Sequence, residues 1–241
     1  MDRPSEHGKI FLDAFRYSIP VLLGYLAIGT AFGLLMAGAG YPWTLTLLMS
    51  LVMYAGAGQY IAVGLFAAGT SLWEAALVQL VVNARHIAYG LSMIKRFKHA
   101  GPLRYYLVFG LTDETFALLS SLPDNGGQGG PPDSAGRTRF MFFVTALNQL
   151  YWVTGSLTGA IAGSLLPFST EGIGFALTAL FVVLMVEQIL RVRRAAVFVI
   201  SAIPAVLGVI FLPSRMSLLA AMALALAAAS LAAKTKQRPA G

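Results

Sequence analysis

The sequence predicts an all-α fold, a polytopic bundle of about eight helices that cross a membrane, and two observations support this. First, 57% of the 241 residues are hydrophobic and only 11% are charged, whereas about 25% of the residues in a soluble domain are charged. Second, the charges are clustered, so that long uncharged stretches alternate with short basic segments. This alternation is typical of membrane spans and their flanking loops. It does not fit a soluble globular fold.

The long apolar stretches predict the individual spans. They cover residues 17–36, 43–66, 72–94, 103–122, 140–166, 172–190, 195–212 and 217–233. Between the fourth and fifth stretches lies PDNGGQGGPPDSAG, which is too polar to cross a membrane and too rich in Gly and Pro to fold. The expected organisation is a cytoplasmic N-terminal segment (1–16), a first transmembrane half (17–122), a flexible linker loop (123–139), a second transmembrane half (140–233) and a basic tail (234–241).

Glycines mark the first two spans. Gly29 and Gly33 are four residues apart in the first span, a spacing that favours close packing against another helix. In the second span Gly56 and Gly58 weaken the helix, and Gln59 follows directly. Either the helix breaks there and exposes backbone groups that can bind a ligand, or it continues with a small-residue packing face. In the fifth span, glycines again recur every fourth residue, which predicts a close seam: Gly155, Gly159 and Gly163.

The third span contains side chains that are costly in a membrane. Gln79, Asn83, His86 and Gly90 fall on one helical stripe, whereas Arg85 lies about 120° away from it. A charge at mid-membrane costs roughly 2.5–3.5 kcal/mol, so Arg85 is either paired or lines a wet cavity. Either it faces a second neighbouring helix, or the helix distorts. A structural counterion and a satisfied structural histidine are the plainer interpretations of Arg85 and His86.

Acidic and amide side chains lie in the later spans. Asp113 and Glu114 are adjacent near the centre of the fourth span. Neighbouring carboxylates repel in a medium of low dielectric constant, so one tends to hold a proton unless a cation is near. Asn148 and Gln149 lie in the first half of the fifth span, and Glu187 lies near the end of the sixth. A functional or charge-pairing role is expected for the two adjacent acids, whereas a surface position remains an alternative for Glu187.

The basic segments predict the orientation. The net charge is +7, and both ends of the chain and residues 191–194 are basic. Eight spans with cytoplasmic termini place all three on the cytoplasmic side, as the positive-inside rule requires, and leave the basic loop at 95–104 outside as one exception. Spans one to three and four to six then have opposite orientations. A short match of residues 31–35 with 115–119 favours an inverted repeat of three plus three.

Four motifs are specific when they are taken together. They are Gly24-Tyr25 with Gly29-x-x-x-Gly33, Tyr54-Ala55-Gly56-Ala57-Gly58-Gln59, Val82-Asn83-Ala84-Arg85-His86-Ile87-Ala88-Tyr89-Gly90 and Leu111-Thr112-Asp113-Glu114. Through them, residues 15 to about 194 resemble the AzlC family, the large subunit of bacterial branched-chain amino acid exporters. The resemblance implies a bacterial inner-membrane transporter that exports branched-chain or similar small apolar amino acids. It also implies coupling to a proton or ion gradient and a small membrane partner of the AzlD type.

The candidate substrate-binding or coupling residues are flexible or polar positions within the apolar stretches. They are Gly56, Gly58, Gln59, Asn83, Arg85, His86, Asp113, Glu114, Asn148, Gln149 and Glu187. One hypothesis assigns the substrate carboxylate to Arg85, to Asn83 or to the backbone N–H groups at 56–58. The same hypothesis assigns the substrate ammonium group, or a coupling proton, to Asp113 or Glu114. A wet His86 would titrate near neutral pH.

Other classes of protein are less well supported by the sequence. An intramembrane enzyme is not expected, since no zinc-protease or hydrolase motif is present. With no cysteine and only three histidines, neither a metal site nor a cofactor is expected. The basic residues flank the spans, so nucleic acid is not an expected partner. A channel and a non-transporting assembly subunit remain alternatives, and the sequence leaves a homo-oligomer open.

Overall fold

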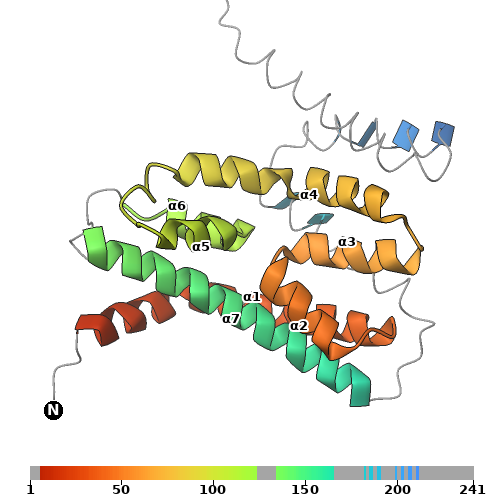
Figure 1. Cartoon of the computed structure of the whole chain (residues 1–241), viewed down its shortest axis with the longest axis horizontal. Helices are drawn as coiled ribbons and strands as arrows, with labels where there is room; N and C mark the ends of the chain where they lie inside the picture. Colours follow the sequence, from red (N-terminus) through yellow and green to blue (C-terminus); the bar gives the residue numbers. More distant parts are fainter. Residues whose placement is uncertain are drawn as a thin grey trace, which may run out of the picture. The chain divides into compact units, whose positions relative to one another are not determined.

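The computed structural model describes residues 6–123 and 134–165, together with scattered positions between 182 and 211. In the two continuous ranges all regular structure is helical, which confirms the predicted fold class there (Figure 1). The helices are α1 (Glu6–Gly38), α2 (Trp43–Val52), α3 (Gly56–Ala67), α4 (Leu72–Met93), α5 (Leu103–Phe109), α6 (Asp113–Ser120) and α7 (Ser134–Leu165). The chain divides into two compact units, one of residues 1–71 with 82–173 and the other of residues 72–81 with 174–241. The candidate site lies in the first unit.

Two helices begin earlier than the apolar pattern predicts. α1 extends back into the expected N-terminal segment because Ile10 and Ala14 continue its buried face. α7 begins at Ser134, so residues 134–139 of the expected linker are helical. Among the described helices, only α1 combines the length and the hydropathy needed to cross a membrane.

Some sequence expectations fall on other parts of the chain. The spans expected at 172–190, 195–212 and 217–233 lie outside the continuous described ranges, and Glu187 is not among the described residues. The count of eight spans therefore stays a prediction.

The core of this unit is a glycine seam between α1 and α7. A Cβ atom added to Gly29 would lie 3.1 Å from the backbone of Ser156, and one added to Gly33 would overlap the backbone of α7. Gly155 and Gly159 face α1 in the same way. The two helices run parallel, because positions 29 and 33 meet positions 155 and 159 in order. The close packing predicted from the glycine spacing is confirmed.

The second expected span consists of two helices joined by a sharp reversal. α2 and α3 run in opposite directions (Figure 1). The start and the end of this hairpin therefore lie together, with the rings of Tyr41 and Phe66 5.9 Å apart. The chain reverses at Tyr54, whose φ of 38° is uncommon for a residue other than glycine. Of the two alternatives for Gly56 and Gly58, the helix break is confirmed.

The fourth expected span is also a helical hairpin, so the prediction of one continuous helix there was wrong. Arg96, in the loop before α5, donates hydrogen bonds to the carbonyl oxygens of Leu119 and Leu122 at the end of α6. The entry and the exit of this hairpin therefore lie together. Gly110 ends α5 and Thr112 caps α6, and these two local signals outweigh the apolar pattern.

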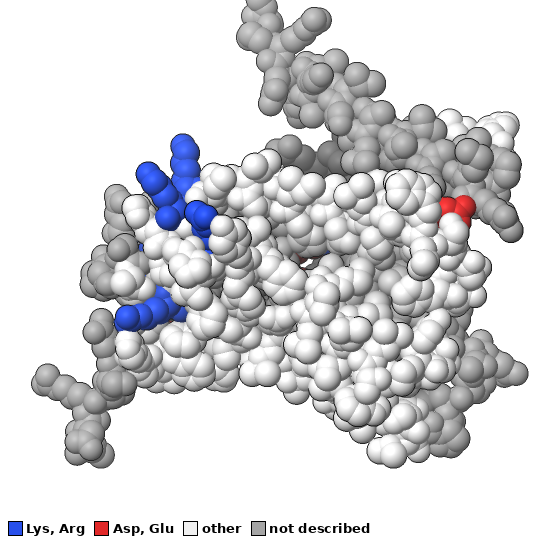
Figure 2. All heavy atoms as spheres, in the orientation of Figure 1, with Lys and Arg blue, Asp and Glu red and all other residues white. Residues whose placement is uncertain are grey.

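The loop at 95–104 lies at the same end of this unit as the start of α1. The Tyr17 hydroxyl of α1 donates to the carbonyl oxygen of Leu118 in α6 at 3.0 Å, and Arg139 of α7 contacts His7 at 3.2 Å. Figure 2 shows Lys and Arg side chains gathered at one end of the molecule. The expected orientation places the loop and the N-terminus on opposite sides of the membrane, and their membrane sides stay a prediction. Each hairpin returns to the end of this unit at which it begins.

The two hairpins enter the unit from opposite ends (Figure 1). α3 runs beside the second half of α1, where the Tyr60 hydroxyl donates to the carbonyl oxygen of Ile28 at 2.6 Å. α6 runs beside the last turns of α4, where the rings of Tyr89 and Phe116 stack at 4.4 Å. The interrupted helices are thus the second and fourth expected spans. A repeat of three plus three would match span two with span five and span four with span one. It would therefore not match the two interrupted spans with each other.

Candidate functional site

The tips of the two hairpins meet against α7. The rings of Tyr54, between α2 and α3, and Phe109, at the end of α5, lie 6.3 Å apart. Gln149 of α7 joins the two hairpins. Its side-chain nitrogen donates to the carbonyl oxygen of Leu51 at 3.2 Å, and its side-chain oxygen accepts from the Tyr106 hydroxyl at 2.7 Å. Gln149 therefore links two segments that are far apart in sequence.

The first turn of α3 is a backbone site shielded by an aromatic ring. α3 follows Ala55, which offers no capping side chain. The first N–H groups of a helix lack acceptors within the helix and favour negative charge. Trp152 of α7 lies over this turn, since a Cβ atom added to Gly56 would be 3.2 Å from the Cη2 atom of the indole. Glycine at this position therefore permits the close approach of Trp152.

Gln59 holds the two arms of the first hairpin together. Its side chain is completely buried, and its side-chain nitrogen donates to the Ser50 hydroxyl of α2 at 3.3 Å. Its backbone N–H donates to the carbonyl oxygen of Ala55 at 2.8 Å, while its side-chain oxygen has no hydrogen-bond partner. Gly58, on the same turn, is buried. These two candidates therefore lie at the tip of the hairpin, as the break predicts.

The two adjacent acids occupy the first turn of α6. Thr112 is the N-cap residue, and its hydroxyl accepts a hydrogen bond from the backbone N–H of Thr115 at 3.2 Å. Asp113 and Glu114 follow, where the helix dipole stabilises negative charge by about 0.3–1 kcal/mol. Gly110 followed by a Thr-Asp-Glu start is a recognisable signal for a helix end and a new helix. That signal would have predicted this second break.

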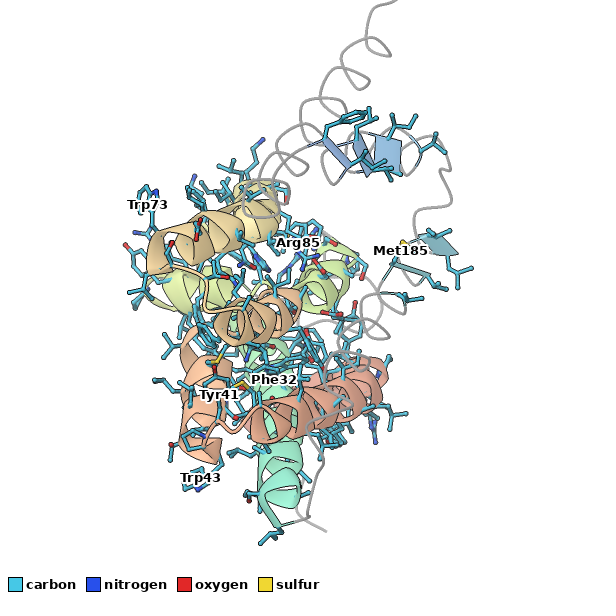
Figure 3. All side chains as sticks on the ribbon, turned by 90° about the vertical axis from the view of Figure 1, so that its right-hand side faces the viewer. Phe32, Tyr41, Trp43, Trp73, Arg85 and Met185 are labelled. Carbon is cyan, nitrogen blue, oxygen red and sulfur yellow. The ribbon has the colours of Figure 1, made fainter. Side chains whose placement is uncertain are left out.

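Asp113 is paired with the arginine of α4. The Nη1 atom of Arg85 lies 2.7 Å from Oδ2 of Asp113, and the Tyr89 hydroxyl donates to Oδ1 at 2.6 Å. Arg85, labelled in Figure 3, and Tyr89 are one helical turn apart on α4, and both side chains contact Asp113 of α6. This decides the alternative left open by the stripe analysis, because Arg85 faces a second neighbour. The charge of Asp113 is compensated.

The imidazole of His86, also on α4, makes local contacts. The Nδ1 atom of His86 lies 3.2 Å from the carbonyl oxygen of Asn83, and its ring meets the edge of Tyr89 at 5.8 Å. These contacts remain within one helix. The structure does not join His86 to either acid by a hydrogen bond, and the plainer interpretation of this histidine fits the geometry.

Glu114 has a different environment from its neighbour. The Tyr25 hydroxyl of α1 lies 2.6 Å from Oε2 of Glu114 and 2.6 Å from the Thr112 hydroxyl. The chain of hydroxyl groups continues from Thr112 to Thr115 at 3.0 Å, and Asn148 of α7 donates to Thr115 at 3.0 Å. Within the described part of the chain Glu114 has no ion-pair partner. Asp113 is thus paired with a cation, whereas Glu114 is hydrogen-bonded to a neutral hydroxyl.

Besides the Gln59 oxygen, three buried polar atoms around these tips make no hydrogen bond to the described residues. They belong to the Tyr54 hydroxyl, the Trp152 indole nitrogen and the Asn148 side-chain oxygen. Their side chains are at most 3% exposed. An unpaired buried polar group costs about 1–3 kcal/mol, so each one calls for an explanation.

Sequence reasoning missed several residues that build this region. Tyr25, Thr112 and Thr115 surround Glu114, Tyr89 supports Asp113, and Trp152 covers Gly56. A tyrosine or threonine inside an apolar run has little effect on hydropathy and can cap, pack or bind. Only the fold shows that these hydroxyl groups converge on the acids.

Comparisons with known proteins agree with the sequence resemblance. The family described as AzlC protein matches residues 20–166. A membrane protein of Helicobacter pylori is 45% identical, over 76% of this chain and 77% of the relative. The branched-chain amino acid transport protein AzlC of Bacillus subtilis is 36% identical, over 80% of this chain and 74% of the relative. The inner membrane protein YgaZ of Escherichia coli is 29% identical, over 81% and 80%. No solved structure matches the chain.

Proposed function

This chain is a membrane protein of the AzlC family, and on that premise we propose that it exports branched-chain or similar small apolar amino acids in exchange for protons. The name of the Bacillus subtilis relative supports the substrate class. The hairpin tips support a transport site, because interrupted helices inside a membrane protein expose backbone groups where ligands bind. The observation that carries the proposal is the position of Glu114.

Glu114 lies in the first turn of α6, and within the described part of the chain its carboxylate accepts a hydrogen bond from a neutral hydroxyl, that of Tyr25. Its neighbour Asp113 already has Arg85 as a counterion. An ionisable side chain inside a membrane protein is costly and marks a pathway for ions, protons or substrate. Glu114 is thus the acid available to bind the ammonium group of an amino acid. The same carboxylate is available to bind a proton.

The exchange follows from competition for this one carboxylate. A proton that binds Glu114 removes the charge that holds the substrate ammonium group, so proton binding releases the substrate. The hydroxyl chain adapts to both forms. Ionised Glu114 accepts from the Tyr25 hydroxyl, whereas protonated Glu114 donates to that hydroxyl, which then donates to Thr112. Both directions use the same contacts of 2.6 Å.

The same geometry supports a membrane topology. α4 has 22 residues and α7 has 32, so both are long enough to cross a bilayer, while α1 alone among the described helices also has the hydropathy. The two hairpins would then each reach halfway from opposite sides. The basic loop at 95–104 comes to lie on the same side as the start of α1, and the positive-inside rule places both in the cytoplasm. This topology removes the exception that eight full spans require.

The proposal also includes a location and a partner. The chain would act in the bacterial inner membrane with both termini in the cytoplasm. It would work with a small membrane subunit of the AzlD type, which the family resemblance implies. Association into homo-oligomers is compatible with this arrangement.

Counterflow in proteoliposomes tests the function. Vesicles loaded with unlabelled L-leucine should accumulate labelled L-leucine, and an imposed pH gradient should drive net flux in the wild-type protein. Glu114→Gln should abolish the drive by the pH gradient, because the amide cannot exchange a proton. Asp13→Asn, a carboxylate of α1 outside the site, is the matched control and should behave as wild type.

Two results would contradict the proposal. Flux that does not saturate and shows no counterflow would indicate a channel. Glu114→Gln with normal flux and normal response to the pH gradient would remove this residue from the mechanism. Each assay is run with the chain alone and with the AzlD-type subunit, so that a requirement for the partner is not mistaken for inactivity.

A further inference from the structure

We propose that the first turn of α3, together with Trp152 and Tyr54, binds the carboxylate of the substrate, while Glu114 and Asn148 bind its ammonium group. This inference rests on the proposed function and assigns the two ends of an α-amino acid to the two hairpins. It also takes the substrate carboxylate away from Arg85, because that guanidinium is already paired with Asp113.

The donor side of the site is at α3. The start of α3 has no capping side chain, and its first N–H groups attract an anion. The Trp152 indole, which lies over Gly56, has a buried nitrogen without an acceptor. An indole N–H is a donor only, so it requires an acceptor such as a carboxylate oxygen. Tyr54, two residues before Gly56, has an unpaired hydroxyl that can donate as well.

The acceptor side of the site is at Glu114. Its carboxylate accepts from Tyr25 through one oxygen, Oε2. The side-chain oxygen of Asn148 is also buried without a donor, since that side chain uses its nitrogen on Thr115. Both groups are acceptors, and an ammonium group supplies three donors.

The two sides are neighbours through a short series of contacts. Trp152 lies against Gly56 and meets the edge of the Tyr25 ring at 5.4 Å, and Tyr25 is hydrogen-bonded to Glu114. Tyr54 also lies close to both Tyr25 and Glu114. The donors near α3 and the acceptors near α6 are thus neighbours, and a zwitterionic head group needs both.

A single-tryptophan protein provides the direct test. The chain contains three tryptophans, so Trp43→Phe with Trp73→Phe leaves Trp152 as the only indole. In this variant, reconstituted as the full chain, L-leucine should change the emission of Trp152 with saturation. L-Leucinamide, which lacks the carboxylate, should bind at least about tenfold more weakly, as expected for the loss of one charged hydrogen bond.

A second variant tests the same site by ligand binding, measured as the thermal shift that each ligand produces. Trp152→Phe keeps an aromatic ring and removes the N–H group, so it should weaken L-leucine binding about tenfold and leave L-leucinamide unchanged. Tyr54→Phe should act in the same direction. Trp43→Phe, at an exposed tryptophan, is the control and should change neither ligand.

The outcomes separate this inference from the proposed function. Leucine counterflow with a Trp152 signal that leucine does not alter would overturn the carboxylate site and leave the transporter intact. An equal loss of leucine and leucinamide binding in Trp152→Phe would also overturn it, since that pattern reflects packing. If the wild-type protein shows no amino-acid exchange, the proposed function fails first.

Discussion

Arg85 of α4 and Asp113 of α6 form an ion pair of 2.7 Å between Nη1 and Oδ2, and their side chains are 33% and 17% exposed. The pair joins α4 to the first turn of α6, the second helix of the second hairpin. The Tyr89 hydroxyl donates to the other carboxylate oxygen. Asp113 is therefore neutralised by a structural contact, whereas Glu114 has no ion-pair partner among the described residues.

The ion pair is expected to stabilise the fold. Arg85→Gln and Asp113→Asn should each lower the unfolding temperature in detergent, because either change leaves a partly buried charge without its partner. The double variant should be less destabilised than the sum of the two single variants, with a coupling free energy of about 0.5–3 kcal/mol. Additive effects in this cycle would show that the pair contributes nothing specific.

The glycine seam gives a second prediction. Gly33→Ala should destabilise the protein by about 3 kcal/mol or more, at the upper end of overpacking effects, because the added methyl group meets backbone atoms of α7. Gly24→Ala, on the same helix with no atom within 4 Å of the added carbon, should be neutral or stabilising by up to about 1 kcal/mol. Thermal unfolding of both variants in one detergent checks the difference. Similar losses in both would argue against the seam.

The packing of the second hairpin tip can be tested with a destabilising substitution and a second one that compensates for it. A Cβ atom added to Gly110 would overlap the Cγ2 atom of Thr145 in α7, although the glycine has an ordinary φ of −82°. Gly110→Ala should therefore reduce both stability and leucine exchange. Adding Thr145→Ser removes that methyl group and keeps the hydroxyl that donates to Met141, so the double variant should recover. No recovery would mean that Gly110 is needed for another reason.

The topology can be read by thiol labelling, because the sequence contains no cysteine. Lys9→Cys, Lys98→Cys and Thr44→Cys each introduce one exposed thiol. A membrane-impermeant maleimide should label the first two only in inside-out vesicles and the third only in intact cells. Labelling of the Lys98 variant on the same side as the Thr44 variant would restore the arrangement with eight full spans.

The helix breaks show how far local signals reach. The Gly-Ala-Gly-Gln sequence at 56–59 raised the alternative of a break that the structure confirms. The break at 110–112 was missed, although a glycine and a capping threonine flank it. The apolar run dominated that interpretation, because hydropathy reports whether a segment prefers lipid and gives no information on whether its helix is continuous.

The candidate site, too, was predicted only in part from the sequence. The sequence identified Gly56, Asp113, Glu114 and Asn148 as polar or flexible positions that apolar packing does not require. It did not identify Trp152 as the residue over Gly56. A side chain from a helix almost a hundred positions away enters the site only through tertiary packing.

By itself, the sequence determined that this protein is a helical membrane protein of the AzlC family, that glycines line its closest helix contact, and that its interior carries acids, amides and an arginine. Composition, spacing and motif carry this information because each is a property of the chain or of a single helix. Only the tertiary structure decided that Arg85 belongs to Asp113 while Glu114 faces Tyr25. The periodicity of a helix fixes the face on which a side chain lies, but the neighbour on that face depends on where the chain reverses direction.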